Sequence, residues 1–152
     1  MRGTIKKVII ATDRSVASEG AAEVGIDLAR ESGSRAAAVY VVDVTRPTHL
    51  HGYTSFLGIK DSLLRDMLEE GSKATGHVEK LAEEVQVPLE KIIRQGGQSA
   101  ELLRISNESP GSVLARGRVG RSGLKKFLIG SVADKVVRHA KVPVLMVPGI
   151  GD

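Results

Sequence analysis

The chain has 152 residues, of which 41% are hydrophobic and 26% are charged, a composition typical of a soluble globular protein. Cysteine is absent, which excludes disulfide bonds, thiol catalysis and cysteine-ligated metal sites. Aromatic residues make up 3%, too few for a base-stacking platform that binds single-stranded nucleic acid, and no apolar run is long enough to span a bilayer. We expect residues 1–152 to form one domain. Because no charged-then-apolar signal segment opens the chain, we expect a cytoplasmic location.

The first half of the chain predicts two strands and two helices. The apolar run at 5–11 predicts a buried strand. Apolar residues at helical spacing predict a helix over 15–32, and a β-branched run predicts a second strand over 36–44. Residues 45–60 contain proline and glycine and predict a long loop, after which a long helix is expected over 61–85. The predicted inward face of the first helix consists of Ala17, Ala21, Val24 and Leu28.

The second half predicts three more strands and two more helices. Strands are expected at 89–94, 112–115 and 142–147, and helices at 99–106 and 131–140. Alternating strands and helices imply a parallel sheet that is covered on both faces. Ligands of such folds bind at the carboxyl ends of the strands, where the strand order reverses.

Glycines are regularly spaced after the fourth predicted strand. Gly117, Gly120, Gly130 and Ser131 form the pattern G-x2-G-x9-G-S, which leads into the last predicted helix. Glycine lets backbone N–H groups approach an anion closely, because no Cβ stands in the way. A helix N-terminus adds unpaired N–H donors and a positive partial charge. The pattern therefore predicts a site for the phosphates of a nucleotide.

Positive charge is concentrated beside this pattern. Residues 112–141 contain eight basic residues and one acid, whereas the rest of the chain is slightly acidic. Such a cluster attracts anions. Arg121 and Lys125 lie within the glycine-spaced segment, where phosphate contact and simple solvent exposure are equally reasonable interpretations.

Several of these residues also have structural interpretations. Ser131 and Asp134 fit a capping box, in which the serine caps the helix and the acid reaches back to it. Asp13, at the end of the first strand, could cap the first helix. His49 and His51 form an isolated H-x-H, which is too few ligands for a metal site. The Walker A pattern is absent, which argues against a P-loop NTPase.

Four segments of the chain resemble the universal stress protein family. They are KVIIATDRSVASEGAAEVGIDLA, VVDV, RQGGQSAELL and GRSGLKKFLIGSVADKVVRHAKVPVLMV, and together the similarity covers nearly the whole chain. The resemblance implies a single-domain three-layer α/β sandwich with a five-stranded parallel sheet in the order 3-2-1-4-5. It also implies a homodimer that pairs through the last strand, 142–147, which is consistent with the need of an edge strand for a partner.

The resemblance further implies ATP as the ligand, because the family members that bind ATP keep the glycine pattern. Asp13 and the backbone of Val41 would hold the adenine, and Gly117 would lie beside the ribose. Magnesium or manganese, if present, would be held by the phosphates themselves.

The phosphates would be bound by residues of the glycine pattern and of the helix that follows. By the same resemblance these are Gly120, Gly130, Ser131 and the backbone N–H of Val132. This sequence departs from the family at Arg14, where glycine is usual, at Gln98, where proline is common, and at Arg116, where an apolar residue is usual. Arg14 and Arg116 could reach toward phosphate or ribose, or they could crowd the pocket.

The sequence thus predicts an ATP-binding module of stress signalling that acts as a dimer. Two alternatives stay open. One is slow ATP hydrolysis or phosphotransfer by Arg121, Lys125 and Ser131, for which no general base is apparent. The other is a protein-interaction dimer without nucleotide. Nucleic-acid binding is disfavoured, since basicity alone does not supply a groove-reading element.

Overall fold

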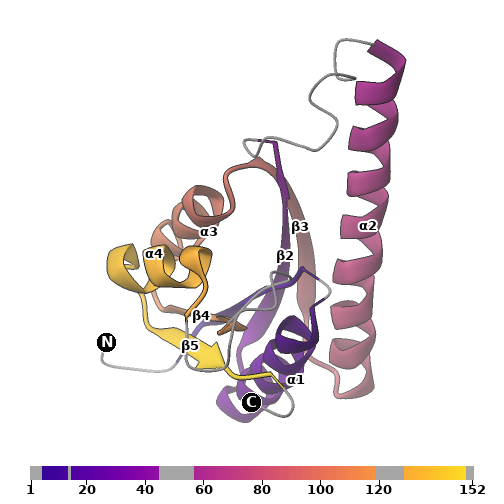
Figure 1. The fold of residues 1–152 in the computed structure, drawn as a ribbon. Coiled ribbons are helices and arrows are strands. Elements are labelled where there is room, and N and C mark those ends of the chain that lie inside the picture. Colours follow the sequence, from indigo (N-terminus) through magenta and orange to yellow (C-terminus); the bar gives the residue numbers. More distant parts are fainter. Residues whose placement is uncertain (1–4, 14, 45–56, 119–128, 150–152) are drawn as a thin grey trace.

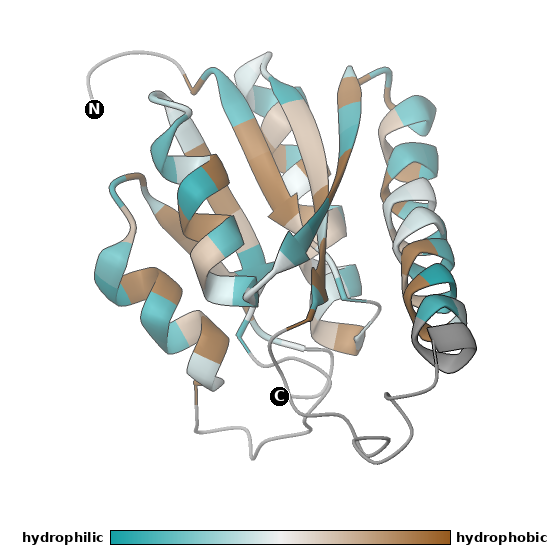
Figure 2. Cartoon of the chain, turned by 90° about the horizontal axis from the view of Figure 1, so that it is seen from above, coloured by the Kyte–Doolittle hydropathy of each residue, from teal (hydrophilic) through white to brown (hydrophobic). Residues whose placement is uncertain are grey.

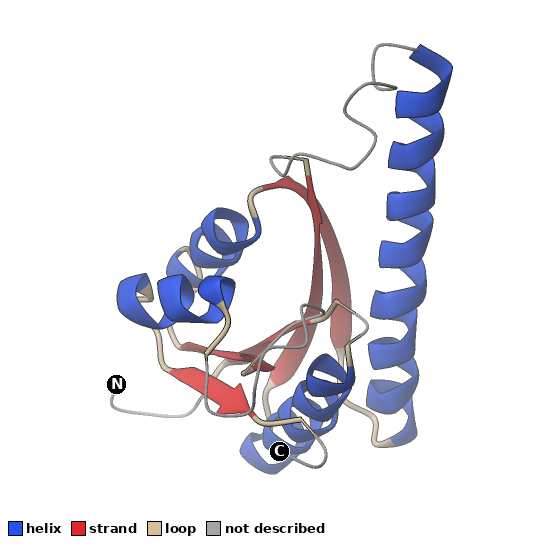
Figure 3. Cartoon of the chain, in the orientation of Figure 1, coloured by secondary structure: helices blue, strands red, loops and turns tan. Residues whose placement is uncertain are grey.

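Five parallel strands form one sheet in the order β3-β2-β1-β4-β5, as predicted. The computed structural model describes residues 5–13, 15–44, 57–118 and 129–149. The elements are β1 Lys7–Ala11, α1 Val16–Ser32, β2 Arg35–Asp43, α2 Leu57–Glu84, β3 Leu89–Gly96, α3 Gln98–Asn107, β4 Ser112–Gly117, α4 Ser131–His139 and β5 Val144–Val147. Figure 1 shows their arrangement in space, and Figure 3 separates helices from strands.

Helices cover both faces of the sheet. Residues of α1 and α2 pack on one face, around Val8 and Ile10 of β1. Residues of α3 and α4 pack on the other face, around Ile9 of β1 and Leu114 of β4. Figure 2 shows the apolar colours concentrated in the strands and on the inward sides of the helices. The three-layer arrangement follows from the near-continuous apolar strands, because each strand has to be buried on both faces.

Helix α1 starts and ends at residues suited to those places. Ser15 is its N-cap, and the Oγ of Ser15 accepts a hydrogen bond from the N–H of Ser18 at 3.1 Å. Gly33 ends the helix in the left-handed conformation, with φ of 65°. The helix also packs close to the sheet, because a Cβ on Gly25 would lie 2.7 Å from the Cγ1 of Ile10. Small residues therefore set the distance between α1 and β1.

The structure corrects three predictions about these elements. Helix α2 begins at Leu57, so the last residues of the predicted loop are helical; Gly58, with its low helix propensity, obscures this start. Strand β4 continues to Gly117, because it keeps its pairing with β5 past Ala115. Val24 is 41% exposed, because the buried stripe of α1 runs instead through Ala22 and Ile26.

The strand order reverses between β1 and β4, which makes the carboxyl ends of these two strands a topological switch point. The chain leaves β1 toward β2 and β3, and then crosses to β4 and β5 on the other side of β1. The connection that leaves β1 and the connection that leaves β4 therefore run in opposite directions from the carboxyl ends of these strands. In parallel α/β sheets such a divergence opens a crevice.

Candidate functional site

A pocket occupies this switch point. The residues after β1, the second half of β2, the end of β4 and the first turns of α1 and α3 line it. Asp13, Val41, Arg116 and Gly117 are among these residues. A second, polar hollow adjoins it and lies between the first turns of α3 and α4. Gln98 lines both, so the two hollows adjoin at the start of α3, and together they are called the crevice below.

Asp13 holds the turn that leads from β1 into α1. Its Oδ1 accepts a hydrogen bond from the backbone N–H of Ser15 at 2.9 Å. The N-cap of α1 is Ser15 and not Asp13. Asp13 instead holds Ser15 in place through the hydrogen bond to its backbone N–H. Among the described residues, the Oδ2 of Asp13 accepts no hydrogen bond, which leaves this carboxylate oxygen available to a ligand in the pocket.

Val41 offers backbone groups to the same pocket. The carbonyl of Val39 accepts a hydrogen bond from the N–H of Thr12, so alternate residues of β2 direct their backbone toward β1. The register of β1 against β2 ends at Ala11 and Val39. Val41, two residues further along β2, therefore directs its N–H and C=O past the end of β1. A planar group with one donor and one acceptor could pair with this stretch of backbone.

Gly117 has a packing role that does not depend on a ligand. A Cβ at this position would lie 2.6 Å from the Cβ of Ala17 and 2.8 Å from its carbonyl carbon. Only glycine lets β4 end this close to α1. The first glycine of the pattern thus brings the two walls of the pocket together.

Helix α4 begins at the other end of the glycine pattern with its first turn uncapped by any side chain. Gly130 is the N-cap, and its N–H donates to the carbonyl of Arg118 at 3.2 Å. Ser131 is the first helical residue and lines the polar hollow together with Val132. The early N–H groups of a helix lack intrahelical partners, so this turn presents donors to the hollow.

The capping box, which is the structural alternative to phosphate binding at Ser131, is not formed. Ser131 lies inside the helix and Gly130 takes the N-cap position, without a side-chain hydrogen bond. Asp134 pairs with Arg138 on the solvent side, at 3.0 Å between its carboxylate oxygens and the Nε of Arg138. The structural explanation of Ser131 is thereby removed, and its position beside the hollow remains.

Some predicted residues lie outside the described part of the chain. Gly120, Arg121 and Lys125 fall within residues 119–128, which the structure does not describe. Arg14 and the His49–His51 pair also lie outside the described residues. Within the described residues, Gly117 and Gly130 are brought to one edge by the hydrogen bond to Arg118, as the glycine pattern requires. Also within the described residues, no group of three or more histidine, aspartate or glutamate side chains could hold a metal ion.

Two contributors stand outside the predicted nucleotide contacts: Arg116, for which the sequence leaves ligand contact and crowding of the pocket open, and the start of α3, which the sequence does not predict as part of the site. Arg116 is 7% exposed and lines the pocket, and its Nε donates to the carbonyl of Gly117 at 2.9 Å. Burial lowers the pKa of Arg116, and the charge of Asp13 opposes the shift. The N-terminus of α3, with Gly97 as an N-cap that makes no side-chain hydrogen bond, faces the polar hollow through Gln98 and Ser99. A charged residue at the end of an apolar strand was the available signal for Arg116.

The comparison with known proteins agrees with the fold. Residues 4–148 match the model of the universal stress protein family. The chain is 34% identical to the universal stress protein MJ0531 of Methanocaldococcus jannaschii over 143 residues, which covers 93% of this chain and 81% of that protein.

Solved structures show the same architecture. The protein MJ0577 of M. jannaschii superposes with a TM-score of 0.82 at 23% identity, over 99% of this chain and 100% of that one. A universal stress protein family protein of Arabidopsis thaliana, solved with AMP bound, superposes with a TM-score of 0.65 at 16% identity, over 97% of this chain and 94% of that one. Within the described residues, no helix combines the length and apolar content that a membrane span needs. The family match and the close relative establish that this chain belongs to the universal stress protein family.

Proposed function

We propose that this chain is an ATP-binding universal stress protein, a nucleotide-dependent module of stress signalling. One observation carries the proposal. The pocket at the switch point between β1 and β4 continues into a hollow that faces the uncapped N-terminus of α4. A site for a neutral polar group and a site for an anion therefore lie side by side, which is the arrangement that a nucleotide needs.

The base would bind at the β1 and β2 side of the crevice. There the carboxylate oxygen of Asp13 that accepts no hydrogen bond from the described residues can accept from the exocyclic amine of adenine, and the backbone of Val41 offers both a donor and an acceptor. Gly117 would approach the ribose. The relative of A. thaliana that is solved with AMP supports an adenine nucleotide as the ligand class.

The phosphates would bind at the start of α4. The N–H groups of Ser131 and Val132 and the hydroxyl of Ser131 lie beside the hollow, and the N-terminus of α4 favours negative charge. Gly120, Arg121 and Lys125, from the connecting segment, would complete the phosphate site. Magnesium or manganese would be carried in by the phosphates.

A homodimer through residues 142–147 is part of the same proposal. Strand β5 is an edge of the sheet, and its apolar side chains Val144, Leu145 and Met146 are only half-buried in the single chain. An unpaired apolar edge is unfavourable in water, and a second copy of the chain would cover it.

Isothermal titration with ATP tests the nucleotide site. The variant Gly130→Val is informative, because φ of Gly130 is −61° and any residue can adopt that conformation. The valine side chain would obstruct the approach of a phosphate without straining the backbone, so we expect ATP binding to be lost. Gly76→Val on α2 is the matched control, because a Cβ at Gly76 would meet nothing within 4 Å. Absence of ATP binding by the unmodified protein would refute the proposal.

A further inference from the structure

Arg116 is a buried cation at the centre of the crevice. Along β4, Leu114 belongs to the core under α3 and α4, whereas Ala115 belongs to the core under α1 and α2. Side chains alternate along a strand, so Arg116 projects to the side of Leu114, under α3 and α4. The guanidinium is therefore on the face of the sheet from which the pocket and the polar hollow are built.

The guanidinium is incompletely satisfied. Its Nε donates to the carbonyl of Gly117 at 2.9 Å. Among the described residues, its two terminal nitrogens make no hydrogen bond and no carboxylate lies within ion-pairing distance of them. Asp13 acts on it only through longer-range attraction. Neither nitrogen is among the described side-chain atoms that are fully buried without a partner, so both are open to the pocket and to an acceptor that enters it.

The start of α4 is joined to the chain just after β4, close in sequence to this side chain. Arg118, two residues along from Arg116, accepts the hydrogen bond from the N–H of Gly130. Two residues of a strand span about 7 Å, which is comparable to the length of an arginine side chain. Gln98 lines both the pocket that contains Arg116 and the hollow at the start of α4. An anion held at Ser131 and Val132 would therefore bind in a hollow that adjoins the pocket of Arg116.

Space in the pocket also points toward movement of this side chain. The pocket lined by Arg116 encloses about 60 Å³, whereas sites for small molecules usually enclose about 300 Å³ or more. The adjoining polar hollow is larger, at about 370 Å³, so it gives the guanidinium room to turn toward an anion bound there.

We propose that Arg116 is a specificity-determining residue that donates its terminal N–H groups to a phosphate of the bound nucleotide. The planar fork of a guanidinium matches two phosphate oxygens, and the pair would be formed in a largely water-excluded crevice. The chain thereby gains a buried phosphate contact from β4, in addition to the N-terminus of α4. This inference rests on the proposed nucleotide site and names the residue that selects for its phosphate group.

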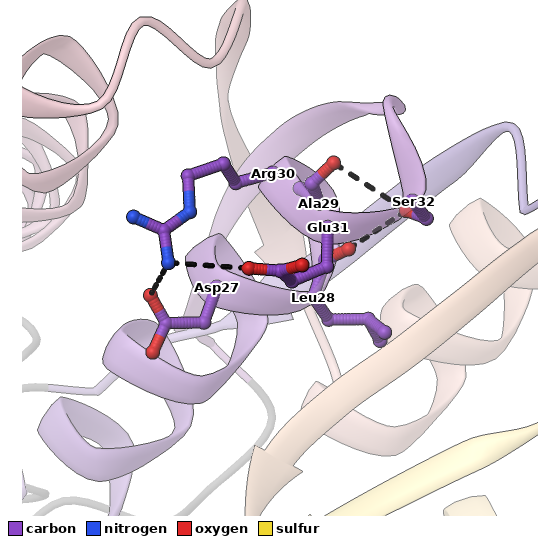
Figure 4. Close-up of polar contacts among 6 residues, drawn as sticks. All are labelled: Asp27, Leu28, Ala29, Arg30, Glu31 and Ser32. Atoms are coloured by element: carbon purple, nitrogen blue, oxygen red, sulfur yellow. Dashed lines mark hydrogen bonds and ion pairs between the residues drawn. The ribbon is translucent and has the colours of Figure 1, made fainter.

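The experiment compares four proteins by isothermal titration with ATP, inorganic tripolyphosphate and adenosine. The proteins are the unmodified chain, Arg116→Met, Arg116→Lys and the control Arg30→Met. Arg30 is an exposed arginine at the far end of α1, where it pairs with Asp27 at 3.8 Å and Glu31 at 3.3 Å (Figure 4). Circular dichroism verifies that each variant is folded.

We expect Arg116→Met to weaken ATP and tripolyphosphate binding about tenfold or more, the effect of losing a hydrogen bond to a charged group. Arg116→Lys should restore part of this loss, and Arg30→Met should bind ATP as the unmodified chain does. Binding of adenosine should not change between the unmodified chain and Arg116→Met.

Three results would overturn the assignment. If Arg116→Met binds ATP equally well or more tightly, Arg116 only fills the pocket. If adenosine loses as much affinity as ATP, the contact is to the nucleoside. In both cases the proposed nucleotide site itself would stand, because the unmodified chain binds ATP. If the unmodified chain binds no ATP, the proposed function fails and the role of Arg116 fails with it.

Discussion

Gly117 at the end of β4 lies directly against Ala17 in the first turn of α1, so close that a Cβ on Gly117 would be 2.6 Å from the Cβ of Ala17. This contact joins the two elements that flank the pocket. It also shows that a glycine in a ligand-binding pattern can be required by packing before any ligand is considered.

Gly117→Ala should therefore destabilise the protein. The added methyl meets both the side chain and the backbone of Ala17, so α1 or β4 has to shift, at a cost of about 1–3 kcal/mol in the free energy of unfolding. Urea denaturation measures the change. Gly76→Ala is the control, since open space surrounds Gly76 and alanine should stabilise α2 by about 0.5–1 kcal/mol. Equal stability of Gly117→Ala and the unmodified chain would show that the contact relaxes without cost.

Arg116→Met should stabilise the protein in the absence of nucleotide. Burial lowers the pKa of Arg116, which means that the folded state disfavours its charged form relative to the unfolded chain. The charge therefore subtracts from stability at every pH below the range where arginine titrates, and an unbranched apolar side chain removes that cost. We expect a gain of about 1–2 kcal/mol by thermal or urea unfolding. A decrease in stability would mean that the hydrogen bond to Gly117 and the attraction to Asp13 outweigh desolvation.

Gly130→Asp separates helix capping from anion binding. Aspartate is a better N-cap than glycine by a few tenths of a kcal/mol, and the backbone of Gly130 already has the extended conformation of an N-cap. The same carboxylate would occupy the donors at the start of α4 and repel phosphate. We expect stability in urea to be unchanged or slightly raised, and ATP binding by titration calorimetry to be lost. Retained ATP affinity would place the phosphates elsewhere.

Met146→Pro tests the dimer edge. The carbonyl of Pro143, just before β5, accepts from the N–H of Leu114 in β4, and the carbonyl of Val147 accepts from the N–H of Arg118, just after β4. Alternate residues along β5 therefore direct their backbone toward β4, and Met146 directs its N–H outward. Proline there removes only a donor that a second copy would use. Light scattering after size exclusion should show monomers in place of dimers. A variant that stays dimeric would exclude pairing through β5.

Much of the fold could be predicted from local pattern. The apolar strands and the helical spacing are properties of short windows, and every predicted element is present, with boundaries that shift by a few residues. Strand ends were less certain, because pairing with a neighbour decides them: β4 reaches Gly117 only because β5 lies beside it. The order of the strands came from the family resemblance and is confirmed.

The candidate site, too, could be predicted from the sequence only in part. Asp13, Val41 and Gly117 line the predicted pocket, and Ser131 and Val132 line the adjoining hollow. Local pattern alone left two interpretations of Ser131 open, and the structure excludes helix capping, because Gly130 is the N-cap and its N–H donates to the carbonyl of Arg118.

The sequence by itself determined the alternation of strands and helices, the polar residue after β1 and the glycine spacing before α4, because neighbouring residues encode these features. Only the tertiary structure decided that Arg116 is buried, that Gln98 lines both hollows and that Gly117 touches Ala17. Burial depends on which distant segments cover a residue, and α1 and α3, which flank β4, come from parts of the chain far from the glycine pattern.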